Sequence, residues 1–202
     1  MLISNEVILV ATSGDTGKAA LDGFKNVDQT KILVFYPQEG VSKIQRLQML
    51  TQQGDNVSVF AVKGNFDDAQ SGVKQIFSDS KYNEYLNEKG FKLSSANSIN
   101  WGRLLPQIVY YFSAYADLVN DKKITMGDKV NFTVPTGNFG DILAGFYAKC
   151  MGLPVNRLIC ASNSNNVLTD FLKTGTYGRN REFFKTISPS MDILISSNLE
   201  RL

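Results

Sequence analysis

The residues of this 202-residue chain that could do chemistry lie mainly in two short turns of glycine and small polar residues. The first turn reads TSGDTG from Thr12 to Gly17, and the second reads TGNFGD from Thr136 to Asp141. Each follows an apolar run and precedes an amphipathic run, which predicts a connection from a strand to a helix. Glycine lets the backbone approach a ligand, and the first turn of a helix presents unpaired N–H groups at the positive end of its dipole. Such a turn can bind a phosphate or carboxylate without a cationic side chain.

The same residue types also occur in turns that bind nothing, because Ser, Thr, Asp and Asn cap helices and Gly is common in turns. A third turn, GNFDD from Gly64 to Asp68, resembles the second but lacks its second glycine, and we interpret it as a capped helix start. Neither glycine turn has the spacing of a nucleotide-binding motif. The residues alone therefore leave a purely structural role open.

A third polar stretch is ANSINWGR, from Ala96 to Arg103. It places Asn97, Ser98 and Arg103 close in sequence to Trp101, the single tryptophan. Arginine is a strong ligand for phosphate or carboxylate, and neighbouring amides can orient an oxyanion. The alternative is a polar crossover whose Asn and Ser side chains satisfy backbone groups while the tryptophan fills the core.

Composition excludes several classes of function. The chain contains no histidine, so it supplies no Ser-His-Asp triad, no histidine-ligated zinc and no histidine base. A net charge of +2 without blocks of like charge gives no indication of nucleic-acid binding. The apolar runs are too short to span a membrane, and the start of the chain lacks a signal-peptide pattern. Cys150 and Cys160 fit no zinc spacing, no metal is expected, and we interpret both as core thiols in a reducing, cytoplasmic compartment.

Strand and helix patterns alternate along the chain, which predicts an α/β fold. Apolar strands are expected at Glu6–Thr12, Lys31–Pro37 and Val57–Gly64, each followed by a helix, so we expect parallel pairing with right-handed crossovers. After about residue 90 the pattern changes to a long helix starting near Leu104, followed by further strand–helix pairs. We therefore expect two open parallel-sheet αβα units, a small domain at 1–92 and a larger one at 93–202. The second unit is expected to be incomplete, because the run Met191–Leu202 looks like a new element that stops.

Three motifs occur in a fixed order: VATSGDTGKAALDGF, SANSINWGRLLPQIVYYF and VPTGNFGDILAGFYAKCMGLP. Together they resemble the threonine synthases, which are pyridoxal-phosphate enzymes of the tryptophan-synthase-β fold type, fold type II. The resemblance covers nearly the whole chain. It implies that the activity is conversion of O-phospho-L-homoserine and water to L-threonine and phosphate. It also implies pyridoxal phosphate as cofactor, which carries the electron-sink chemistry while the protein supplies orientation and electrostatics.

The resemblance also implies roles for individual residues. The second glycine turn would surround the phosphate of pyridoxal phosphate: Gly137, Asn138, Phe139 and Gly140, with Asp141 adjacent. The first glycine turn would bind the substrate around its carboxylate: Ser13, Gly14, Asp15, Thr16 and Gly17. Related enzymes often have Asn at the position of Asp15, so its carboxylate is expected to cap the helix and leave anion binding to N–H groups. Asn97, Ser98 and Arg103 would bind the leaving phosphate, with Arg103 pairing with it.

One motif of the family is missing from this sequence. Its Schiff-base lysine lies in a motif like His-Gly-Pro-Thr-x-x-Phe-Lys-Asp, which the resemblance would place upstream of Met1. The residue that contacts the pyridine nitrogen is expected beyond Leu202. We therefore expect an internal fragment that contains no catalytic residue and is inactive alone. Two alternatives stay open: another fold type II enzyme acting on a β- or γ-substituted amino acid, and a non-catalytic anion-binding domain. The sequence does not predict the oligomeric state.

Overall fold

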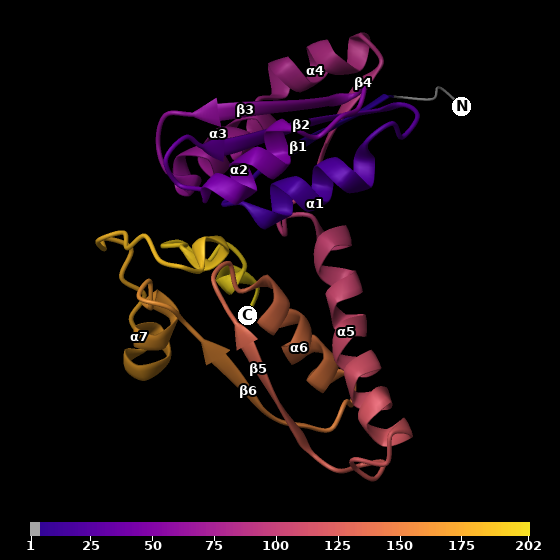
Figure 1. The fold of residues 1–202 in the computed structure, drawn as a ribbon, viewed down its shortest axis with the longest axis vertical. Coiled ribbons are helices and arrows are strands. Elements are labelled where there is room, and N and C mark those ends of the chain that lie inside the picture. The colour runs from indigo at the N-terminus through magenta and orange to yellow at the C-terminus, as the bar shows by residue number, and fades with distance from the viewer. Residues whose placement is uncertain (1–4) are drawn as a thin grey trace. The chain divides into compact units, whose positions relative to one another are not determined.

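The computed structural model describes residues 5–202, which form two compact units. The first unit runs up to Asn97 and also includes Lys185–Ser190; the second contains Ser98–Phe184 and Met191–Leu202. Figure 1 follows the chain through both units. The division expected at residues 92 and 93 stays a prediction for the domains of the whole protein.

The first unit contains a parallel sheet with strand order β3-β2-β1-β4. Its strands are β1 (Asn5–Ala11), β2 (Thr30–Pro37), β3 (Val57–Val62) and β4 (Phe91–Ser95). β1 is central and pairs with β2 and β4, with Ile8 opposite both Ile32 and Ser94. The near-continuous apolar sequence of β1 suits a strand that is covered on both faces. This confirms the predicted α/β class with parallel sheets.

Helices cover both faces of this sheet. Ile8 and Val10 pack with Leu21 of α1 (Asp15–Phe24) and Met49 of α2 (Lys43–Leu50). Residues of opposite parity in β1 pack with Val73 of α3 (Phe66–Ser78) on the other face. The alternation follows from the two-residue period of a strand.

The sequence did not predict two elements of the first unit, helix α4 (Ser80–Glu88) and strand β4. Helix α4 contains no buried residue, and its sequence SKYNEYLNE is mostly polar. It contacts β4, which was not among the predicted strands. The turn at Gly64–Asp68 is a capped helix start, as interpreted: Asn65 and Asp68 form a capping box, with N–H···O distances of 3.0 and 2.8 Å.

The second unit contains the parallel pair β5 (Val130–Pro135) and β6 (Val155–Ala161). Helix α5 (Trp101–Asn120) packs along α6 (Gly140–Cys150), and α7 (Val167–Thr174) ends at Gly175. The core of this unit joins residues of α5, α6 and β5 with α7, among them Leu104, Leu143 and Leu168. Within residues 5–202, no helix combines the length and apolar character that a bilayer crossing needs.

Three details of the second unit differ from expectation. Helix α5 begins at Trp101 rather than Leu104, because Asn100 caps it by accepting a hydrogen bond from the Gly102 N–H at 2.9 Å. The run Met191–Leu202 contains only short 3₁₀ turns, η1 (Pro189–Met191) and η2 (Leu199–Arg201). Cys150 is exposed, so it is not a core thiol.

Candidate functional site

The second glycine turn connects β5 to α6 and is crowded. Phe139, at the N-cap of α6, has φ 68°, a left-handed backbone that is uncommon for a residue with a side chain. A Cβ on Gly137 would lie 2.9 Å from Cδ1 of Ile193, and one on Gly140 would lie 3.2 Å from Oδ1 of Asn138. A side chain at either position would therefore press on a neighbouring side chain, most closely on Ile193.

The turn leaves several backbone donors without partners. The Gly140 N–H donates to Oδ1 of Asn138 at 2.9 Å. Among the described residues, no acceptor is found for the N–H groups of Gly137, Asn138, Phe139, Asp141 and Ile142. These donors lie at the positive end of the α6 dipole, which is the arrangement that binds phosphate groups. The residues present therefore fit the phosphate of pyridoxal phosphate.

Asp141 lies in the first turn of α6 and is half-buried. Burial raises the pKa of its carboxyl, while a hydrogen bond from Tyr111 and the charge of Arg103 lower it. The Tyr111 hydroxyl donates to the backbone carbonyl of Asp141 at 2.8 Å. Burial, and then the nearby carboxylate, raise the pKa of Tyr111, so this hydroxyl stays protonated. The positive charge of Arg103 thus acts on the Asp141 carboxyl, which belongs to the second glycine turn.

Ser98 also lies beside this turn and is buried. A Cβ on Gly140 would be 3.4 Å from Cβ of Ser98 and 3.4 Å from Nδ2 of Asn198. The Asn198 amide donates to Oγ of Ser98 at 2.7 Å. Two predicted site residues, Ser98 and Gly140, therefore lie together in the second unit.

Sequence reasoning missed the residues that donate hydrogen bonds to the carbonyls of the second glycine turn. Oγ of Ser196 donates to the Gly137 carbonyl at 2.6 Å, and the Asn198 N–H donates to the Asn138 carbonyl at 3.1 Å. The run SSN at 196–198 contains no spacing that predicts a site. Only the three-dimensional structure identifies its contacts with the turn.

The first glycine turn is organised by Thr12. Its hydroxyl oxygen accepts from the N–H groups of Gly14 and Gly17, at 2.9 and 2.8 Å. Gly14 has φ 146°, a conformation that favours glycine. In the described chain, no acceptor is found for the N–H groups of Ser13, Asp15 and Thr16. This turn therefore also offers backbone donors to an anion.

The expected cap by Asp15 is wrong. The Asp15 carboxylate accepts from Nε2 of Gln45 at 2.9 Å and from the hydroxyl of Ser190. Thr12 takes the capping role because its hydroxyl precedes the helix and reaches the N–H groups directly.

Asn97 is buried at the end of the first unit. Its Oδ1 accepts from the Ala11 N–H at 2.9 Å, and its Nδ2 donates to the Ala11 carbonyl at 2.6 Å. This pairing satisfies the last residue of β1, as in the structural alternative for this stretch. Within the described part of the chain, one amide hydrogen and one oxygen lone pair of Asn97 have no partner.

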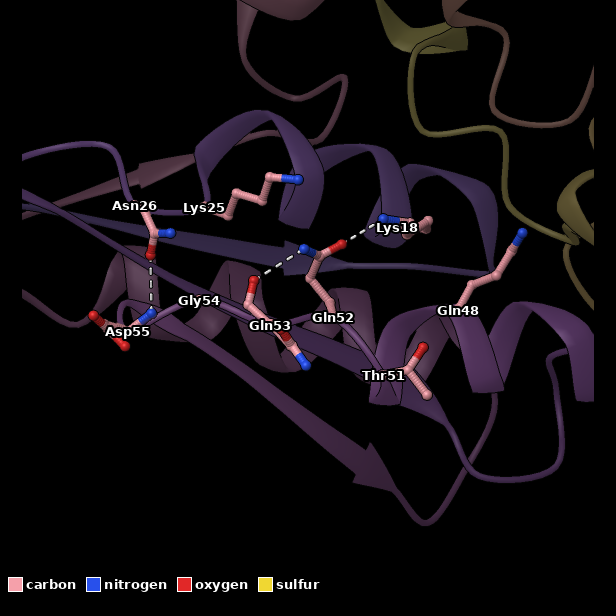
Figure 2. A pocket seen from close by; sticks show the side chains of 9 residues that line it. All are labelled: Lys18, Lys25, Asn26, Gln48, Thr51, Gln52, Gln53, Gly54 and Asp55. Carbon is pink, nitrogen blue, oxygen red and sulfur yellow. Dashed lines mark hydrogen bonds between the residues drawn. The ribbon is translucent and has the colours of Figure 1, made fainter.

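A surface cavity of about 680 Å³ lies elsewhere, among polar residues around α1 and α2. Figure 2 shows the Gln52 amide between the Lys18 amine and the Gln53 carbonyl. Lys18 and Lys25 both lie beside Asp22, with N···O distances of 3.5 and 2.7 Å. Because this carboxylate compensates both lysines, the cavity offers less to an anion than the glycine turns do.

The chain is similar to proteins named threonine synthase or threonine synthase-like. The mouse protein named threonine synthase-like 1 is 52% identical over 204 residues, covering 98% of this chain and 27% of its own length. Threonine synthase from Escherichia coli matches with a TM-score of 0.86 and 39% identity, covering 98% of this chain and 44% of that one. Pyridoxal-phosphate-bound threonine synthase from Brucella melitensis matches with a TM-score of 0.80 and 46% identity, covering 98% and 40%. No protein-family model matches the chain. The chain thus spans less than half the length of each of these relatives.

Proposed function

We propose that this chain, which matches one part of the threonine synthases in sequence and fold, forms the phosphate-binding part of a pyridoxal-phosphate site. The whole protein then converts O-phospho-L-homoserine and water to L-threonine and inorganic phosphate, a carbon–oxygen lyase reaction. The observation that carries the proposal is the set of backbone donors without acceptors at the start of α6. It occurs in a chain 46% identical to a threonine synthase that binds this cofactor.

The second glycine turn holds the cofactor phosphate in this proposal. The groups assigned to it are the backbone of Gly137, Asn138, Phe139 and Gly140, with Asp141 adjacent. When bound, pyridoxal phosphate supplies the electron sink of the reaction. The turn contributes fixed N–H dipoles, which bind an anion without the reorganisation that water would need. Hydrogen bonds from Ser196 and Asn198 to the carbonyls of Gly137 and Asn138 hold the turn that carries these dipoles.

The substrate is bound by two other groups of residues in the proposal. N–H groups of the first glycine turn bind its carboxylate, and that turn consists of Ser13, Gly14, Asp15, Thr16 and Gly17. Arg103 pairs with the substrate phosphate and stabilises the charge that develops as phosphate leaves. The influence of Arg103 on the Asp141 carboxyl supports its place near the cofactor turn. The remaining donor of the Asn97 amide completes this set.

No residue of the chain is assigned as the covalent partner of the cofactor. The lysine motif of the family does not occur in the sequence, so we propose that these 202 residues alone do not catalyse the reaction. A cytoplasmic location belongs to the same proposal and is supported by Cys150 and Cys160, which are both free thiols.

The experiment uses the full-length protein incubated with pyridoxal phosphate and one of three substrates. These are O-phospho-L-homoserine, O-phospho-L-serine and O-acetyl-L-serine, with phosphate or acetate release and amino-acid products measured. We expect phosphate and threonine from the first substrate in equal amounts. Turnover of only the other two would point to a different fold type II enzyme. Binding of phosphate with no turnover and no effect of pyridoxal phosphate would point to an anion-binding protein.

A further inference from the structure

We propose that Asn198 and Arg201, here called the clasp, are positioning residues. They orient the Ser98 hydroxyl so that it donates a hydrogen bond to the cofactor phosphate. The proposal rests on the function above, because it concerns the same turn. It adds a side-chain donor to the backbone donors, and it assigns Ser98 to the cofactor phosphate rather than to the substrate phosphate that the resemblance implied. It also assigns a role to a segment in which sequence reasoning found no site.

Asn198 is the centre of the clasp and is only 1% exposed. Its backbone N–H and its side-chain Nδ2 both donate to the Asn138 carbonyl, each at 3.1 Å. The same Nδ2 donates to Oγ of Ser98 at 2.7 Å. A buried amide that uses both hydrogens this way fixes the peptide between Asn138 and Phe139, whose N–H is one of the donors without an acceptor.

The contact with Asn198 decides what the Ser98 hydroxyl can do. Because Oγ accepts from Asn198, the hydroxyl hydrogen must point toward a different acceptor. Among the described residues no such acceptor is found, and Ser98 is only 8% exposed. Its Cβ lies within 3.4 Å of where a Gly140 side chain would begin. The free hydrogen therefore belongs to a buried hydroxyl at the start of α6, where a phosphate oxygen would accept it.

Arg201 fixes the orientation of Asn198. Its Nη1 donates to Oδ1 of Asn198 at 2.9 Å, so the oxygen end of this amide faces the guanidinium and the nitrogen end faces Ser98. The guanidinium also donates to the carbonyls of Ser98 and Ile99, at 2.9 and 2.8 Å. In the ion pairs recorded for residues 5–202, Arg201 has no carboxylate partner. Its charge is therefore not neutralised and favours an anion nearby.

The test separates positioning from simple packing by comparing two ligands. Dissociation constants of pyridoxal phosphate and of pyridoxal, which lacks the phosphate, are measured by absorbance and fluorescence on the full-length protein. For Ser98→Ala and Asn198→Ala we expect the affinity for pyridoxal phosphate to fall about tenfold or more, the loss of one charge-assisted hydrogen bond. Affinity for pyridoxal should change less than twofold. The loss in the double variant should be smaller than the sum of the two single losses, because both changes act on the Ser98 hydroxyl.

Asn165→Ala is the matched control. Asn165 is another buried Asn of the second unit, 7% exposed, and its Nδ2 donates to the Phe184 carbonyl at 2.7 Å. Its variant should lower the unfolding temperature but leave the ratio of the two dissociation constants unchanged. Should Asn198→Ala not fold, Arg201→Lys takes its place, since it keeps the charge and loses the forked contacts.

An unchanged ratio in both the Ser98 variant and the clasp variant would overturn the inference, as would an equal change in the Asn165 control. If the wild-type protein does not bind pyridoxal phosphate more tightly than pyridoxal, the proposed function itself is contradicted. The two failures are therefore distinguishable.

Discussion

The hydroxyl of Tyr111 donates to the backbone carbonyl of Asp141 at 2.8 Å and thereby ties α5 to the first turn of α6. Tyr111 is only 4% exposed, so water does not replace this hydrogen bond easily. Helix α5, which follows Ser98, therefore supports the second glycine turn.

Tyr111→Phe should lower the free energy of unfolding by about 1 kcal/mol, the usual contribution of one hydrogen bond. It should also weaken pyridoxal-phosphate binding, because the start of α6 loses a contact. Tyr115→Phe is the control: that hydroxyl accepts from Gly127 N–H at 2.9 Å and donates to Asp128 O at 3.1 Å, away from the turn. Urea unfolding and cofactor titration check both variants. A cofactor loss as large in the Tyr115 variant would argue against a specific brace.

The Asp141 carboxyl should give stability a pH dependence. Burial raises its pKa in the folded state, with Tyr111 and Arg103 opposing the shift. The folded state therefore binds the proton more tightly than the unfolded state, and this contribution to stability is lost as pH rises from about 4 through the folded pKa. Asp141→Asn should accordingly be more favourable to stability at pH 7 than at pH 4, measured by urea unfolding. An identical effect at both pH values would contradict the raised pKa.

Gly145→Ala should destabilise the second unit by about 1–3 kcal/mol, the usual cost of overpacking. A Cβ there would lie 2.6 Å from Cε1 of Tyr111 and 3.0 Å from Cδ2 of Leu158. Gly72→Ala in α3 is the control, because its Cβ would meet no atom within 4 Å and a helical alanine stabilises by up to about 1 kcal/mol. Thermal unfolding measures both. Equal tolerance of the two alanines would mean that α5 and α6 do not approach so closely.

Arg103→Ala should lower the affinity for O-phospho-L-homoserine about 10- to 100-fold, since a charge-assisted contact to phosphate is lost. The same variant should barely change the affinity for O-acetyl-L-serine, which lacks the phosphate. Arg157→Ala on β6 is the control, because Arg157 is also exposed but lies outside the proposed site. Inhibition constants of both ligands provide the comparison. Equal losses for the two ligands would exclude a phosphate-specific role.

The sequence predicts the framework of this structure well where a physical signal is strong. The apolar run of β1 and the capped helix start at Gly64–Asp68 both have their expected roles. Helix α4 was not recognised, because its short sequence is mostly polar and none of its residues is buried.

The sequence predicts the candidate site less completely. The ordered motifs point to both glycine turns, but they do not identify Asn198 and Arg201. Those residues lie 60 or more positions after Asn138, and their contacts depend on a non-local return of the chain. The partner of Asp15 was missed for the same reason, since Gln45 reaches it from a different helix.

The most direct test of the proposal that the second glycine turn binds phosphate is a crystal structure of the full-length protein with pyridoxal phosphate. We expect phosphate oxygens within about 3.2 Å of the backbone nitrogens of Asn138, Phe139 and Asp141, at ordinary hydrogen-bond length. A bound cofactor whose phosphate lies away from the start of α6, with these N–H groups bonded to protein or water, would contradict the proposal.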